Sequence, residues 1–108
     1  MRKYRVRFIA DAGQDLHDII HYIASHDGLE RALYVLERIE ETCARLKQFP
    51  KRGRIPSELR DLGLGQYREI FFKPYRIIYQ LINKEVYIHC ILDARRDLQT
   101  LLQHRLTR

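Results

Sequence analysis

The sequence predicts a single α+β domain spanning residues 1–108, in which a helical hairpin packs on a curled antiparallel sheet. Two patterns predict this class. Alternating apolar and polar residues mark a short strand near the start and three strands in the second half, and apolar residues at helical spacing mark two helices between them. The expected order of elements is β-α-α-β-β-β-α. A chain of 108 residues fits one core and leaves no length for a second folding unit.

The first half is expected to form one strand and two helices. Residues 4–8 alternate between apolar and basic side chains, which predicts a strand with one wet face ending near Ala10. The next helix covers about residues 11–26 and opens at Asp11. Its apolar stripe is Leu16, Ile19, Ile20 and Ile23. After a break at residues 25–28, helical spacing continues at Leu29, Ala32, Leu33, Leu36, Ile39, Cys43 and Leu46. Neither helix can bury its stripe alone, so the two must pack on each other or on a common sheet.

The second half begins with a long charged loop and continues with strands. Pro50 stops the second helix, and residues 51–65 contain the glycines and proline that are typical of a loop. Loops of this length often carry function. Three strands follow, over residues 67–72, 75–81 and 86–92, joined by the short connections 73–74 and 83–85. They are expected to form an antiparallel meander. Asp97 then caps a last helix that has Leu98, Leu101 and Leu102 on one face.

Composition excludes several classes of protein. No stretch approaches the roughly 18 apolar residues of a membrane span, and the basic start has no apolar run of a signal peptide, so we expect a cytoplasmic protein without a membrane partner. The two cysteines, Cys43 and Cys90, form no CxxC motif. Their expected state is that of buried free thiols.

Motifs for metal and nucleotide chemistry are missing as well. The sequence has no HExxH, P-loop, GxSxG or GxGxxG motif, and we therefore expect no cofactor and no metal. His17 and His21 lie four residues apart and could hold a metal from one helix face. They flank the apolar stripe and have no obvious third ligand, so a wet helix face is the preferred interpretation.

Basic residues are concentrated in the second half. Residues 1–50 hold equal numbers of acidic and basic side chains, and residues 51–108 carry the whole formal charge of +6. This asymmetry suggests an anionic partner, either nucleic acid or an acidic protein segment. The candidate target-binding residues are Lys51, Arg52, Arg54, Arg68, Arg76, Arg95 and Arg96.

These arginines could share one site. Arg68 and Arg76 lie near the connection at 73–74, so they could converge on one sheet face and form a concavity lined by guanidinium groups. Such a site could hold RNA backbone or stabilise the charge of a phosphorane-like transition state. The alternative is ordinary surface salt bridging, for which the available partners are Glu69, Asp93 and Asp97.

Four short motifs in the second half resemble one known family. They are GRIPSELRDL (53–62), YRE (67–69), PYRIIY (74–79) and LDARRD (92–97). In this order and spacing they resemble the RelE/ParE superfamily, the toxins of type II toxin–antitoxin and plasmid stabilisation systems. The resemblance spans nearly the whole chain and includes the order of elements expected from periodicity.

The resemblance implies one of two activities on this scaffold. RelE-like members cleave messenger RNA in the ribosomal A site without a metal, using basic residues and commonly a Tyr or His. ParE-like members inhibit DNA gyrase. By resemblance, Arg54, Arg76 and Arg96 match the RelE-like positions that contact the scissile phosphate. The position expected to hold a catalytic Tyr is Leu102, which cannot transfer a proton.

Other side chains of the sequence could replace the missing proton-transferring group. His89 and His104 have a side chain suited to proton transfer near neutrality, but His89 fits an ordinary strand position. Tyr67, Tyr75 and Tyr79 fit packing roles. The absence of a catalytic Tyr at position 102 therefore favours the ParE-like branch, a toxin that binds its target instead of cutting it.

Partners follow from the same resemblance. It implies a cognate antitoxin that wraps an extended or helical segment across the toxin, with the basic half and the grooves beside the hairpin as docking surfaces. DNA gyrase is the expected target. The alternatives are the ribosome with its mRNA, for a metal-independent endoribonuclease, and a basic binding module without toxicity.

Overall fold

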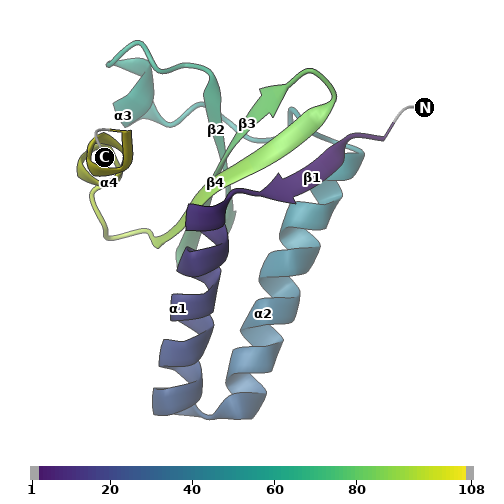
Figure 1. Ribbon diagram of the computed structural model, residues 1–108, viewed down its shortest axis with the longest axis vertical. Coiled ribbons are helices and arrows are strands. Elements are labelled where there is room, and N and C mark those ends of the chain that lie inside the picture. Colours follow the sequence, from purple (N-terminus) through teal and green to yellow (C-terminus); the bar gives the residue numbers. More distant parts are fainter. Residues whose placement is uncertain (1–2, 107–108) are drawn as a thin grey trace.

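The computed structural model describes residues 3–106, in which four strands form one sheet with helices on both faces (Figure 1). The elements are β1 Arg5–Phe8, α1 Ala10–Asp27, α2 Leu29–Ala44, a 3₁₀ turn η1 Arg45–Lys47, α3 Ser57–Arg60, β2 Tyr67–Phe72, β3 Tyr75–Ile82, β4 Glu85–Asp93 and α4 Leu98–Leu106. This order confirms the predicted fold class. The short helix α3 was not predicted, because a single turn within a loop rich in Gly and Pro has no periodic signal.

The two helices of the hairpin meet at Gly28. Its φ is 95°, a conformation that glycine adopts readily because it has no Cβ. This one residue reverses the chain, so the break is shorter than the predicted 25–28 and α1 continues to Asp27. Asp11 lies in the first turn of α1 and does not cap it; the capping position is Ile9, which makes no side-chain cap. A carboxylate in the first turn still interacts favourably with the helix dipole.

The strand order in the sheet is β1-β4-β3-β2. The antiparallel meander of β2, β3 and β4 is confirmed, but β1 joins its edge parallel to β4. An entirely antiparallel sheet was therefore wrong for β1. Short turns force antiparallel pairing between strands adjacent in sequence, whereas the helices between β1 and the meander leave either direction open.

Two hydrophobic cores lie on opposite faces of the sheet, because successive strand residues point to opposite sides. The core under the hairpin includes Ala12, Ile23, Ala32, Val35, Ile39, Cys43, Leu46, Ile70, Ile77, Tyr79, Val86, Ile88 and Ile91. The second core joins α3 and α4 to the other face through Leu59, Tyr67, Ile78, Cys90, Leu92, Leu98 and Leu102. The sequence predicted the first layer, while the second depends on how the C-terminal segment folds back.

The apolar stripes of the hairpin are only partly covered. On α1, Ile23 is buried, while Leu16, Ile19 and Ile20 are half-buried. On α2, the predicted stripe was wrong at two positions, since Leu29 and Leu33 are 66% and 52% exposed. The end of the hairpin where α1 meets α2 extends beyond the sheet in Figure 1, and Leu29 and Leu33 belong to the first turns of α2 at that end.

Cys43 and Cys90 are free thiols, as expected, and both lie in a core. Burial raises the pKa of each thiol to about 12. A thiol in this state is a poor nucleophile, because the reactive species is the thiolate. In the described part of the chain, no helix is both long and apolar enough to cross a bilayer.

Candidate functional site

Arg76 is the centre of an ion network on the face of the sheet that α3 and α4 cover. Its Nε donates to Glu69 Oε1 at 2.9 Å, and its two terminal nitrogens donate to the two carboxylate oxygens of Glu58, each at 2.9 Å. The hydrogen bond from Arg76 lowers the pKa of Glu58, and the same bond raises the pKa of Arg76. Arg76 is 8% exposed, and its charge is balanced by two carboxylates within the protein.

Arg54 is attached to the same network but points outward. Its backbone pairs with Glu69 in an isolated bridge, and its Nε lies 3.4 Å from Glu69 Oε2. The side chain is 74% exposed, with its guanidinium 5.4 Å from the Phe71 ring. Arg52, Arg54, Glu69, Ile70 and Phe71 line an open hollow of about 440 Å³. This hollow presents two exposed guanidinium groups beside one buried carboxylate.

Arg68 lies on the opposite face of the sheet. It pairs with Tyr79, whereas Arg76 pairs with Phe71, and positions three apart on a strand point to opposite sides. The predicted convergence of Arg68 and Arg76 was therefore wrong, because strand register was not visible in the sequence. Arg68 Nη1 donates instead to the carbonyls of Gly53 (2.8 Å) and Lys51 (3.3 Å).

Tyr79 holds the loop that presents these arginines. Its hydroxyl donates to Pro50 O at 2.7 Å and accepts the Gly53 N–H at 3.0 Å. A Cβ on Gly53 would lie 2.6 Å from this hydroxyl and 2.7 Å from Glu69 O, so the loop packs against β2 and β3 more closely than any larger residue permits. Burial raises the pKa of Tyr79. The packing role predicted for Tyr79 is confirmed, with loop positioning added to it.

Arg95 and Arg96 lie apart from this hollow, after β4. Arg95 pairs with Asp93 at 3.1 Å and is 90% exposed. Arg96 lines a second hollow together with Asp97, Thr100, Leu101 and His104. The structure thus places Arg52, Arg54 and Arg96 in two exposed hollows. Arg76 lies in a buried ion network and Arg68 supports a loop, while Lys51 and Arg95 are exposed and line neither hollow. Of the salt-bridge partners predicted for them, Glu69 and Asp93 are confirmed, while Asp97 caps α4 through the Thr100 N–H at 3.2 Å.

Leu102 is a core residue. It is 5% exposed and belongs to the cluster that contains Tyr67, Cys90 and Leu98. A side chain at this position fills the space between α4 and the sheet. Leu102, which cannot transfer a proton, therefore has a packing role in this structure.

His89 occupies an irregular point of β4. Tyr79 pairs with Ile88 and Ile78 with Cys90, which leaves His89 as the extra residue of a bulge. Its Nε2 donates to Gln80 Oε1 at 3.0 Å, and its ring meets Tyr67 edge to face at 5.2 Å. Burial lowers the pKa of His89. These contacts agree with the predicted structural role.

Two features were missed in the sequence. Glu58, on the unpredicted α3, neutralises Arg76. Arg105 on α4 pairs with Asp15 on α1, 90 residues away, with Nη1 to Oδ2 at 3.0 Å. No local pattern links either pair. The only signal for Glu58 in the sequence was its position in the charged loop between Arg54 and Arg68, two of the candidate binding residues.

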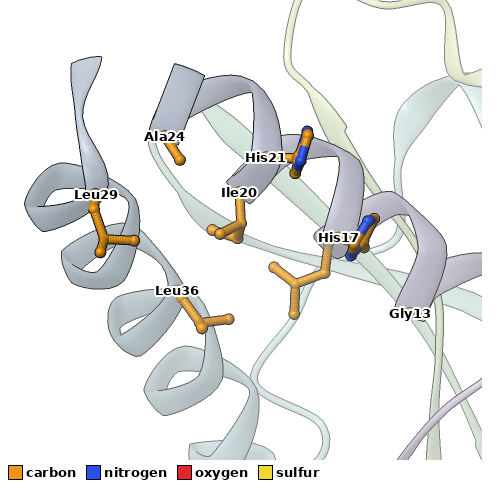
Figure 2. A pocket seen from close by; sticks show the side chains of 8 residues that line it. Gly13, His17, Ile20, His21, Ala24, Leu29 and Leu36 are labelled. Carbon is orange, nitrogen blue, oxygen red and sulfur yellow. The ribbon is translucent and has the colours of Figure 1, made fainter. Parts of the chain in front are cut away.

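A third feature is an apolar groove on the outer side of the hairpin (Figure 2). It has a volume of about 450 Å³ and is lined by Gly13, Leu16, His17, Ile20, His21, Ala24, Leu29 and Leu36. Leu16 and Ile20 of α1 and Leu36 of α2, which are half-buried, meet in this groove. The apolar stripes therefore include residues that face this groove as well as residues that face the sheet.

Chains in two solved structures titled as toxin–antitoxin systems share this arrangement of a helical hairpin and a C-terminal helix on a four-stranded sheet. A chain in the structure titled chromosomal ParDE toxin–antitoxin system from P. aeruginosa matches with a TM-score of 0.72 at 21% identity, covering 84% of this chain and 96% of that one. A chain of the RelBE2 toxin–antitoxin complex from Mycobacterium tuberculosis matches with a TM-score of 0.64 at 22% identity, covering 86% and 93%. These likenesses show a shared fold.

Sequence comparison shows the family. The model of the ParE toxin of the type II toxin–antitoxin system parDE matches residues 6–98. Toxin ParE3 of Caulobacter vibrioides is 37% identical over 84 residues, which is 78% of this chain and 80% of that protein. The chain belongs to the ParE toxin family. The RelE/ParE resemblance, with its ParE-like branch, is confirmed.

Proposed function

We propose that this toxin inhibits DNA gyrase by binding it and does not cut RNA. The proposal rests on the burial of two residues at positions that a RelE-like nuclease would use for catalysis. Arg76 is buried between two carboxylates, and Leu102 lies in the core. A phosphate would have to displace Glu58 or Glu69 to reach Arg76, because both carboxylates already occupy its guanidinium at 2.9 Å.

The proposed target surface is the hollow that contains Arg52 and Arg54, with Lys51 beside it. Exposed guanidinium groups beside an aromatic ring recognise carboxylates and phosphates and supply binding energy at interfaces. Arg95 and Arg96, which lie apart from this hollow after β4, form a second exposed basic pair. Arg68 supports this proposal indirectly, through the loop carbonyls that it holds.

A supercoiling assay tests the target. Purified toxin added to gyrase and relaxed plasmid is expected to stop supercoiling, and Arg54→Glu is expected to raise the half-inhibiting concentration at least tenfold, because it places a negative charge in the hollow. Arg45→Glu is the matched control, since Arg45 is 56% exposed on a different part of the surface. Unchanged supercoiling at a large molar excess of toxin, with cleavage of mRNA on translating ribosomes, would establish the nuclease alternative instead.

We further propose that an antitoxin segment occupies the apolar groove of the hairpin. Two solved structures that share this fold are titled as toxin–antitoxin systems. An amphipathic helix is the occupant that such a groove suits, with apolar residues at helical spacing inserted between Leu16 and Leu36. Docking would cover Leu29, one of the most exposed apolar side chains on the molecule.

Bacterial growth tests this second proposal. Leu29→Glu is expected to remain toxic but to escape neutralisation by the antitoxin encoded beside the toxin, because it buries a charge in the contact. Leu62→Glu is the matched control, because Leu62 is 57% exposed and lies outside the groove. Full neutralisation of Leu29→Glu would remove the groove as the docking site without affecting the gyrase proposal.

A further inference from the structure

Two histidines lie one helical turn apart on the rim of the groove. The ring centroids of His17 and His21 are 5.7 Å apart and their planes differ by 19°. Figure 2 shows both rings on the same side of α1. The other helix histidine of α1, His26, is different, because its Nδ1 lies 2.9 Å from Tyr22 O. The rings of His17 and His21 stack on each other, and both side chains are exposed.

This spacing suits joint coordination of one metal ion. Residues four apart on a helix are displaced by about 6 Å along its axis and lie on the same face. Imidazole nitrogens bind Zn²⁺ at about 2.0–2.1 Å, and the broad χ2 torsion of histidine allows both rings to turn toward a common point. A histidine pair at the same spacing holds zinc in helical HExxH sites.

We propose that His17 and His21 bind a divalent transition metal ion as a two-ligand chelate on the surface of α1. No group of three His, Cys, Asp or Glu within residues 3–106 is placed to hold a metal, so the protein supplies two ligands and water completes the coordination shell. Among divalent ions, Cu²⁺ binds such nitrogen ligands more tightly than Ni²⁺ or Zn²⁺.

The position of the chelate has a consequence for docking. His17 and His21 line the same groove as Leu16, Ile20 and Leu36. A bound ion adds two positive charges and their hydration to this rim. An apolar segment entering the groove would have to displace that water, which costs free energy when the charge is not paired. Metal and the antitoxin segment therefore compete; this second step rests on the proposed docking site, whereas metal binding does not.

Calorimetry on the tag-free toxin at pH 7.5 tests the chelate, with ZnCl₂ and NiCl₂ as the probes. One saturable site per chain is expected. His17→Asn and His21→Asn are each expected to weaken binding at least about tenfold, because loss even of a group that only orients a ligand costs about 10–100-fold. His26→Asn is the matched control and should bind as the parent does. Thermal melts establish that each variant is folded.

Three outcomes would overturn the chelate: no saturable binding, unchanged binding in both variants, or an equal loss in His26→Asn. Competition is measured separately, by adding Zn²⁺ to the toxin–antitoxin complex and following dissociation of the parent and of His21→Asn. Dissociation that is equal in both would exclude competition through this site. Because the first measurement contains no partner, failure of the proposed docking site leaves its result intact.

Discussion

Arg76 is held more firmly than a ligand-binding arginine needs to be. Three of its guanidinium contacts go to carboxylates at 2.9 Å, and they join β3 to α3 and β2. Paired contacts of this kind fix geometry as well as charge. The residue that the family resemblance placed at a scissile phosphate therefore stabilises the fold of this chain.

At this scale we predict a pH-dependent effect of Glu58→Gln. The bond from Arg76 lowers the folded pKa of Glu58, so its contribution to stability is complete above the ordinary value of 4.5 and is lost as the pH falls through the folded value. At pH 7 the variant should be less stable by about 1–2 kcal/mol, a modest figure because Glu58 is 32% exposed. Urea unfolding between pH 7 and pH 3 measures the difference, which should shrink toward acid.

The matched control is Glu40→Gln, an exposed carboxylate on α2. It should change stability little, because Glu40 is exposed. A Glu58→Gln difference that stayed constant down to pH 3 would show that the ion pair contributes nothing through charge.

At the scale of elements, the loop from Pro50 to Arg54 is built as a rigid support. Arg68 and Tyr79 together bind the backbone of Pro50, Lys51 and Gly53. The sequence predicted a long, charged loop, and its length suggested function. The anchoring of this loop depends on which residues of β2 and β3 face it. Periodicity does not determine this, because both faces of the sheet are covered.

We predict that Gly53→Ala destabilises the protein by about 1–3 kcal/mol, because the added Cβ meets Tyr79 Oη and a backbone carbonyl below 3 Å. Gly13→Ala on α1 is the control, since a Cβ there meets nothing within 4 Å and replaces glycine inside a helix. That variant should gain about 0.5–1 kcal/mol. Thermal and urea unfolding measure both, and equal stability of the two variants would contradict the close approach at Gly53.

At the scale of the whole molecule, one ion pair connects the two ends of the chain. Arg105 on α4 binds Asp15 on α1 and also the carbonyl of His89, and Asp15 accepts the Ile91 N–H at 3.0 Å. The side chains of Arg105 and Asp15 are 15% and 11% exposed. This pair joins the helical layer to the C-terminal layer across the edge of β4.

We predict that Arg105→Gln loosens α4 without unfolding the hairpin. Removing one partner leaves Asp15 half of a largely buried pair, a change that costs up to about 3–5 kcal/mol. Hydrogen exchange should become faster across residues 98–106 and remain slow in the buried core of α2. Arg45→Gln, at an exposed surface pair, is the control. Equal protection of α4 in both variants would show that apolar packing alone holds it.

Periodicity and turn chemistry were enough to determine the strands, the hairpin and the order of elements, because those signals are local and repeat along the chain. The sequence alone also showed that the side chain of Leu102 cannot transfer a proton. The sequence by itself thus determined the fold class, and its motifs pointed to the toxin family that the comparisons confirm.

Only the tertiary structure decided how the arginines are used. Whether Arg68 and Arg76 share a face depends on register, and whether Arg76 is free depends on Glu58, which lies 18 residues away on a single helical turn. The parallel pairing of β1, the second core and the apolar groove between α1 and α2 likewise arise from contacts between separate segments. The physical reason is that periodicity assigns each residue to one side of its own element, while the neighbours of that side are set by how the elements pack.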